Sequence, residues 1–195
     1  MTELVLIRHA ATEWTPEHRF QGRKDLPLSA AGRADAALWK LPAAFANYGR
    51  VSSPLLRARE TAELMFGAPA AIEMRMTEMD WGAWEGRTIA ELRAEFGTAV
   101  EMLEARGLDF CPPGGESPRQ VQARVRPVLA ELAVAKRSTV AVAHRGVMRA
   151  VYALAADWDM RGKPPAKLGD GCAHVFVLAP DGTPRVGRLN VDLRP

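Results

Sequence analysis

The chain has 195 residues, of which 48% are hydrophobic and 25% are charged, and its net charge is +3. This size and composition are typical of one globular domain, here residues 1–195, that buries its own core. The basic residues are scattered and no apolar stretch is long enough to span a membrane, so we expect neither a nucleic-acid nor a membrane partner.

The cysteines and the start of the sequence bear on the compartment. Cys111 and Cys172 are too few for a disulfide framework and lack the spacing of metal ligands, so we interpret both as free thiols in a reducing compartment. The apolar run at residues 4–7 is too short for a signal peptide and has no basic residues before it. We therefore expect a cytoplasmic protein.

The first predicted element is a buried strand. Residues 4–7 are Leu, Val, Leu and Ile, a pattern typical of a buried parallel strand. Arg8 and His9 follow it directly, at the end of the strand where ligands bind in open α/β sheets. The polar loop at residues 15–27 is long for a compact domain, and such loops are often functional. Ser29 predicts the N-cap of the first helix.

Two further strands are predicted next. One spans residues 48–52, and the other spans residues 71–76 and leads into Glu78. Between them, the Ser-Pro pair at residues 53 and 54 predicts a helix that starts with a serine cap and a proline in its first turn. This helix carries Arg57 near its start.

Two capping boxes predict helix starts in the middle of the chain. Thr88 with Glu91, and Ser117 with Gln120, each have the spacing at which two residues cap one helix N-terminus reciprocally. The second of these helices is long and contains Pro127, which predicts a kink.

The last part of the chain predicts three strands and one more helix. Residues 138–143 are apolar and β-branched and end at His144, and an apolar helix over residues 147–156 follows. Residues 173–178 and 185–191 predict a hairpin. Because strands alternate with helices, we expect an α/β fold, a three-layer α/β/α sandwich around a mostly parallel sheet of five or six strands with one antiparallel edge strand.

Chemically active side chains follow four of the predicted strands: Arg8 and His9, then Arg57, Glu78 and His144. Right-handed crossovers favour parallel strands, so the carboxyl ends of these strands meet at one edge of the sheet. Taken singly, each residue has an ordinary interpretation as a solvated charge, a core histidine or a loop acid. Together, two arginines and two histidines indicate a pocket for a phosphoryl group.

The same pocket is expected to work without a metal or a cofactor. No residues have the spacing of metal ligands, and no motif indicates a serine, cysteine or aspartate nucleophile. The arginines would then carry the charge that Mg²⁺ carries in other phosphoryl-transfer sites. A helix N-terminus after the second strand would add further positive potential.

Motifs in chain order resemble those of the histidine phosphatase superfamily, which has the phosphoglycerate-mutase-like fold. They are residues 6–12, Gln21, Gly22, Asp25, residues 27–29, Gly32, residues 52–58, Thr61 and Ala62, Glu78, Gly82, residues 84–86, residues 115–117, Arg124, His144 and Gly146. Any one of these motifs is weak evidence, but together they are highly specific.

The resemblance implies a role for each residue at the predicted edge. His9 is implied to be the phosphorylated nucleophile, and Arg8, Arg57 and His144 are implied to bind the phosphate. Glu78 matches the residue that moves the proton, and this implies a phosphomonoesterase with a covalent phosphohistidine intermediate.

Other residues are candidates near the same site. Thr12, Gln21, Gly22 and Arg145 are the candidate substrate-binding residues. Glu85 is the alternative to Glu78 as proton donor, although its place between Trp84 and Gly86 favours a structural role.

The sequence departs from the family pattern at two positions. Ala10 stands where the family usually has glycine, so it adds a methyl group near the phosphate and tolerates a positive φ poorly, which predicts a remodelled pocket floor. Arg145 stands where a small or uncharged residue is commoner, and it adds a cation at the rim or points to solvent.

The expected substrate is a small-molecule phosphomonoester. The segment at residues 169–172 and the segment at residues 112–117 resemble the α-ribazole phosphatase-like branch. Phosphoglycerate mutases of the family are expected to be longer, and the short segment between Gly86 and Glu116 favours hydrolysis. A mutase and a non-catalytic phospho-ligand-binding module remain the alternatives, and the sequence leaves a homodimer open.

Overall fold

The structure, a computed structural model, describes residues 1–194, in which one mixed sheet has the strand order β3-β2-β4-β1-β5-β6, with β7 pairing to β5. The strands are β1 (Thr2–Arg8), β2 (Gly49–Ser52), β3 (Ala71–Ile72), β4 (Thr139–Ala143), β5 (Cys172–Leu178), β6 (Pro184–Val186) and β7 (Val191–Asp192). The α-helices are α1 (Ala30–Leu38), α2 (Leu56–Phe66), α3 (Ile89–Phe96), α4 (Thr98–Glu104), α5 (Pro118–Val134) and α6 (Arg145–Ala155).

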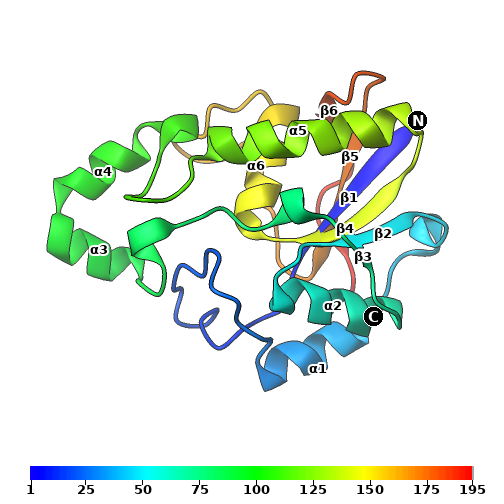
Figure 1. The fold of residues 1–195 in the computed structure, drawn as a ribbon, viewed down its shortest axis with the longest axis horizontal. Coiled ribbons are helices and arrows are strands. Elements are labelled where there is room, and N and C mark those ends of the chain that lie inside the picture. Colours follow the sequence, from blue (N-terminus) through cyan, green and yellow to red (C-terminus); the bar gives the residue numbers. More distant parts are fainter. Residues whose placement is uncertain (195) are drawn as a thin grey trace.

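Helices cover both faces of the sheet. Alternate residues of a strand point to opposite faces, so Leu4 and Leu6 of β1 pack with the α5 and α6 side, while Val5 and Ile7 pack with the α1 side. All four side chains are completely buried. Figure 1 shows α5 and α6 on one side of the strands and α1 and α2 on the other, with α3 and α4 beyond the sheet. The expected α/β/α sandwich is therefore confirmed.

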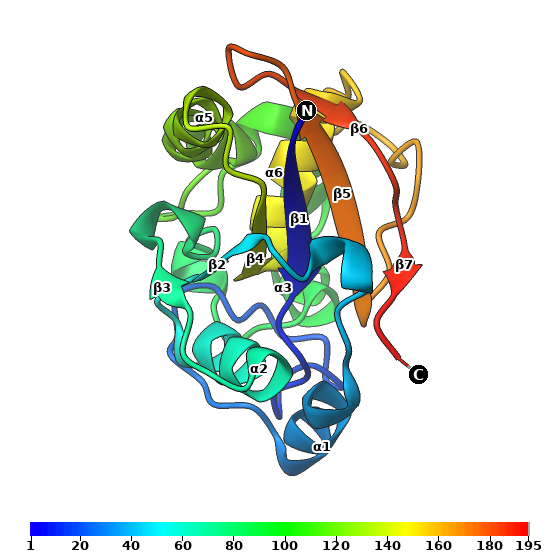
Figure 2. The ribbon, with the colours of Figure 1, turned by 90° about the vertical axis from the view of Figure 1, so that its right-hand side faces the viewer.

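The sheet differs in detail from the prediction. Seven strands are present in residues 1–194, where five or six were expected, and β5 lies inside the sheet although it runs antiparallel to β1. Figure 2 shows β1 between β4 and β5. The expected strand at 185–191 is split into β6 and β7. Asn190 has a φ of 56° and donates its backbone N–H to His174 Nδ1, which interrupts the strand.

The third predicted strand is shorter than expected. Pairing stops at Ile72, and a 3₁₀ turn occupies Met74–Met76. The Glu73 side chain accepts a hydrogen bond from the Arg75 backbone N–H at 3.0 Å, which stabilises the turn in place of the strand.

The predicted start of the second helix is wrong. Helix α2 begins at Leu56, and Pro54 lies before its first turn. The Ser53 hydroxyl lies 2.7 Å from His144 Nε2. Instead, Asp25 Oδ1 accepts the Leu56 N–H at 2.6 Å, so the cap comes from the loop before α1.

The topology brings four segments to one edge of the sheet. Strands β1, β2 and β4 are parallel, so Arg8, Ser52 and Ala143 end at the same edge. Strand β5 is antiparallel to β1 and begins there at Cys172. The carboxyl-terminal edge therefore combines three strand ends with one strand start. No helix within the described residues is long and apolar enough to cross a membrane.

Candidate active site

His9 follows β1, and each of its two ring nitrogens has a hydrogen-bond partner. Its Nδ1 lies 2.7 Å from the Ala10 carbonyl oxygen, and its Nε2 lies 3.3 Å from the Arg57 Nε–H donor. The carbonyl only accepts and the guanidinium only donates, so this bonding assigns the proton to Nδ1 and the lone pair to Nε2. Burial lowers the pKa of His9 well below its usual value, and the charges of Arg8 and Arg57 lower it further. The ring is therefore neutral at pH 7.

Arg57 lies behind His9 in the first turn of α2 and is completely buried. Its Nη1 and Nη2 atoms donate to the carbonyl oxygens of Lys24 and Gly22, both at 2.7 Å. Burial lowers the pKa of Arg57, but a guanidinium stays protonated in proteins. No carboxylate in the described part of the chain forms an ion pair with it. Arg57 therefore has no direct ionic partner among these residues, and the carboxylates of Glu78 and Asp25 act on its charge from a longer distance.

His144 lies between β4 and α6 and faces His9, with 5.1 Å between the ring centroids. Its Nε2 lies 2.7 Å from Ser53 Oγ, while its Nδ1 is buried and has no partner. Burial lowers the pKa of His144 well below its usual value, and the charge of Arg57 lowers it further. Both histidines are therefore neutral and lie side by side.

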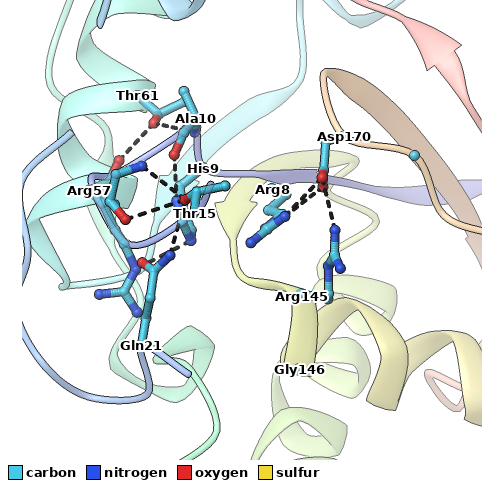
Figure 3. A network of polar contacts seen from close by, with 12 residues as sticks. Arg8, His9, Ala10, Thr15, Gln21, Arg57, Thr61, Arg145, Gly146 and Asp170 are labelled. Atoms are coloured by element: carbon cyan, nitrogen blue, oxygen red, sulfur yellow. Dashed lines mark hydrogen bonds and ion pairs between the residues drawn. The ribbon is translucent and has the colours of Figure 1, made fainter. Parts of the chain in front are cut away.

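Arg8 and Arg145 share one carboxylate. Arg8 Nη1 lies 2.9 Å from each oxygen of Asp170, and Arg145 Nη2 lies 2.8 Å from Asp170 Oδ2. Figure 3 shows this bridge beside the His9 and Arg57 cluster. Asp170 was not predicted as a site residue, because its place at this edge depends on β5 being antiparallel to β1. The structure therefore directs the Arg145 side chain to Asp170, while the side chain stays largely exposed.

Glu78 lies at the N-terminus of α6. One carboxylate oxygen accepts a hydrogen bond from the Gly146 N–H at 3.1 Å. The other accepts one from the backbone N–H of the next residue, Met79, at 2.7 Å. The side chain is buried and lines the same cavity as His9. The alternative, Glu85, is absent from the cavity wall and accepts the Arg23 N–H at 2.6 Å. The geometry therefore brings Glu78, and not Glu85, to the site.

The predicted substrate-binding residues of the loop have different positions. Gln21 and Gly22 line the cavity, whereas Thr12 is completely buried and does not. Thr15 lines the cavity instead, and its hydroxyl oxygen accepts hydrogen bonds from Gln21 Nε2 at 3.1 Å and from the Thr12 N–H at 3.0 Å. Figure 3 shows Thr15 and Gln21 beside His9. Thr12 therefore contacts the cavity residue Thr15 but does not reach the cavity itself.

Ala10 does not remodel the pocket floor. Its φ is not positive, and its methyl group packs in the core with Val5, Ile7 and Leu28. Its backbone N–H donates to Thr61 Oγ1 at 3.0 Å. The expectation that alanine would fit this position poorly is therefore wrong, because Ala10 needs no positive φ and is absent from the cavity wall.

A cavity of about 720 Å³ is lined by Arg8, His9, Gln21, Gly22, Glu78 and Arg145, whereas Arg57 and His144 are not part of its wall. Five aromatic side chains contribute to its wall: Trp14, Phe20, Trp81, Trp84 and Phe110. Residues 1–194 contain four buried polar side-chain atoms without a partner, and three of them belong to Arg8, Gln21 and His144. Unpartnered buried polar groups are rare in folded proteins, and here Arg8 and Gln21 line the cavity while His144 lies next to His9, so these atoms indicate a ligand site.

The chemistry of the site fits an anion. Its cations are guanidinium groups, and the described residues contain no cluster of histidine, cysteine and acidic side chains arranged to hold a metal. Neutral His9 presents a lone pair beside two arginines and a second histidine. The arrangement can bind a tetrahedral dianion and attack it with a ring nitrogen.

Comparison with known proteins agrees with this geometry. The histidine phosphatase superfamily (branch 1) matches residues 4–192. The chain is 31% identical to a 2,3-bisphosphoglycerate-dependent phosphoglycerate mutase of Methylocella silvestris over 92% of this chain and 94% of that protein. It is 32% identical to the mutase of the same description from Methylobacterium radiotolerans, over 92% and 91%. These mutases are therefore not much longer, and the expected difference in length is wrong for them.

A solved structure has the same fold throughout. The mycobacterial glucosyl-3-phosphoglycerate phosphatase superposes with a TM-score of 0.80 and 29% identity, and the match covers 100% of both chains. The motifs, the edge of the sheet at which they meet and the whole-length match agree. The chain belongs to the histidine phosphatase superfamily.

Proposed function

We propose that the protein is a phosphomonoesterase that hydrolyses a small phosphorylated metabolite through a phosphohistidine at His9. The observation that carries the proposal is the His9 ring, whose Nδ1 is tied to a carbonyl while Nε2 keeps its lone pair. In the first step, Nε2 forms a bond to phosphorus as the ester P–O bond breaks. Arg8, Arg57 and His144 stabilise the charge on the transferring group.

Glu78 supplies the proton for the leaving group. An alkoxide leaves poorly unless it is protonated. Both histidines are neutral, and one is the nucleophile while the other binds the phosphoryl group. In the first step, the protonated Glu78 carboxyl group gives its proton to the oxygen of the leaving group. In the second step, Glu78 takes a proton from the water that attacks phosphorus, the N–P bond breaks, and phosphate leaves.

Hydrolysis is favoured over transfer by the size of the cavity. About 720 Å³ is the volume of a typical pocket for a drug-sized ligand, so a three-carbon leaving group leaves room for water beside the phosphohistidine. The similar mycobacterial protein is described as a phosphatase that acts on glucosyl-3-phosphoglycerate.

A phosphoglycerate-type mutase is the second candidate. The observation that favours it is the similarity to the curated mutases over nearly their whole length. Nothing at Ala10 favours a non-catalytic binding module, because this residue needs no positive φ. An α-ribazole phosphate substrate rests on the resemblance of the loop segments alone.

The proposal is tested with p-nitrophenyl phosphate in the presence of EDTA. We expect steady-state release of phosphate by the parent protein, a trapped phosphoryl group on His9 by mass spectrometry, and no turnover by His9→Ala. Matched thermal unfolding of parent and variant controls for folding. Full activity of His9→Ala would exclude the mechanism.

A second measurement separates the alternatives. The protein is incubated with 3-phosphoglycerate, with and without a catalytic amount of 2,3-bisphosphoglycerate. Interconversion of the phosphoglycerates that depends on this primer and releases little phosphate would identify a mutase. Saturable phosphate binding without turnover of any ester would identify a binding module.

A further inference from the structure

Arg149 is a cavity residue that neither the sequence motifs nor the proposed chemistry uses. It lies on α6, one helical turn after Arg145, and its side chain is half-buried in the wall of the cavity that contains His9. Residues four positions apart lie on the same face of a helix. Helix α6 therefore presents two guanidinium groups along the wall that leads away from the phosphoryl site.

Arg149 differs from the other charged residues of the wall because it has no partner. The others are all engaged: Arg8 and Arg145 with Asp170, Arg19 with Glu17 and Glu91, Glu104 with Arg93, and Glu78 with two backbone N–H groups. Arg149 forms no ion pair and no side-chain hydrogen bond within residues 1–194. Burial lowers the pKa of Arg149, and the charge of Arg145 lowers it further, with no carboxylate acting against them.

The Trp158 ring holds the Arg149 guanidinium in place but accepts no hydrogen bond from its N–H groups. Arg149 Cζ lies 5.3 Å from the ring centroid, a distance at which a cation interacts favourably with an aromatic face. A stacked guanidinium keeps its in-plane N–H donors free for a planar or tetrahedral anion. The Arg149 side chain is therefore held in place while its N–H donors have no hydrogen-bond partner in the described residues.

We propose that Arg149 anchors a second anion-binding subsite, so that the preferred substrate is a phosphomonoester whose leaving group carries a second anionic group. This inference rests on the proposed phosphatase activity and specifies its substrate class. The helical rise places Arg149 about 7.5 Å along the axis from His144, a separation that a leaving group of a few carbon atoms spans. A carboxylate and a second phosphate share the required chemistry.

Matched substrates test the proposal. Phosphoserine and phosphoethanolamine differ by a carboxylate, and fructose 1,6-bisphosphate and fructose 6-phosphate differ by a phosphate. We expect the parent protein to prefer the member with the additional anion in at least one pair, by about tenfold to a hundredfold in kcat/KM. The pair that shows the preference identifies the anion. Equal kcat/KM values within both pairs would overturn the proposal.

Variants of Arg149 assign the preference to this side chain. Arg149→Met keeps an apolar stem against Trp158 and removes the charge, so it should abolish the preference while the value for p-nitrophenyl phosphate stays unchanged. Arg149→Lys should keep part of the preference. The control is Arg188→Met, because Arg188 stacks 5.5 Å from the Phe45 centroid and is absent from the cavity wall. A preference that survives Arg149→Met, or an equal loss on all substrates, would contradict the subsite.

Binding measurements separate this proposal from the proposed activity. Turnover of p-nitrophenyl phosphate without a preference within the pairs removes the subsite and leaves the phosphatase. If no ester turns over, calorimetry with the same pairs decides. Tighter binding of the member with the additional anion, lost in Arg149→Met, then supports the subsite although the proposed activity has failed.

Discussion

At the scale of single residues, the two central histidines have opposite hydrogen-bonding roles. His9 donates through Nδ1 to a carbonyl and keeps Nε2 as an acceptor. His144 has its Nε2 beside the Ser53 hydroxyl, and when it accepts that O–H, the unpartnered Nδ1 carries the proton. One ring then offers a lone pair and the other offers a donor. Two adjacent neutral imidazoles therefore suit a nucleophile and a phosphate-binding group.

The role of Glu78 is tested by the leaving group. Glu78→Gln removes the acidic proton but keeps an acceptor for the Gly146 N–H. We expect kcat/KM for an alkyl phosphate to fall about a hundredfold or more, because the leaving alkoxide is no longer protonated. Hydrolysis of p-nitrophenyl phosphate should fall much less, because its phenolate leaves unaided. Steady-state kinetics of one variant on the two substrates makes this comparison.

Equal losses on both substrates would contradict this role. The amide contacts would then mean that Glu78 holds the start of α6 in place. Thermal unfolding of the variant distinguishes the two roles. Replacing a carboxylate that holds α6 in place should lower the stability of the protein, whereas replacing a proton donor should not.

The sequence predicted most of the site at this scale and missed the charged partners. His9, Arg57 and His144 were found because each follows a recognisable strand. Asp170 and Arg149 were missed because a single acid in a loop and a single arginine in an apolar helix resemble ordinary surface charges. Their importance depends on which side chains face one cavity, and no short sequence pattern records this.

At the scale of elements, the start of α2 depends on a distant cap. Asp25 Oδ1 accepts the Leu56 N–H at 2.6 Å. We expect Asp25→Ala to lower the free energy of unfolding by about 1 kcal/mol, whereas Asp25→Asn should keep most of it, since both Asp and Asn cap helices well. Urea unfolding of the two variants and the parent measures the difference. Equal stability of the alanine variant and the parent would show that water replaces the cap at no cost.

This cap also explains which elements were predictable. The two capping boxes, Thr88 with Glu91 and Ser117 with Gln120, are confirmed, because their signal lies within four residues. The start of α2 was predicted wrongly, because its cap comes from another loop while Ser53 contacts a histidine. The direction of β5 depends on the same kind of long-range pairing. Local signals therefore gave the elements, and tertiary contacts decided their ends and partners.

At the scale of the whole molecule, three of the four histidines are buried with lowered pKa values: His9, His144 and His174. The unfolded chain therefore binds more protons than the folded protein once the pH falls below about 6.5. Stability rises with pH wherever the unfolded state binds more protons. We expect the free energy of unfolding to be level above pH 7 and to fall below about pH 6.5, by up to about 1.4 kcal/mol per pH unit for each histidine.

Urea unfolding at pH 7.5, 6.5 and 5.5 and constant ionic strength checks this expectation. His174 contributes to this pH dependence from outside the cavity, where its ring nitrogens hydrogen-bond to the backbone of Gly169 and Asn190. Inorganic phosphate in excess should raise the stability of the parent at each pH by binding the folded state only. Stability that is unchanged or higher at pH 5.5 would contradict the burial of neutral histidines.

The central position of β1 has a consequence for synthesis of the chain. Strand β1 pairs with β4 and β5, with Leu4 opposite Thr139 and Leu6 opposite His174. At about 5–20 residues per second, β4 leaves the ribosome roughly 7–27 s after β1, and β5 leaves later still. During that interval an apolar strand has no partner, and such distant pairings also slow folding. A nascent chain that ends before β4 therefore carries His9 and Arg57 but has neither a sheet nor a site, and the exposed strand makes it a target for chaperones.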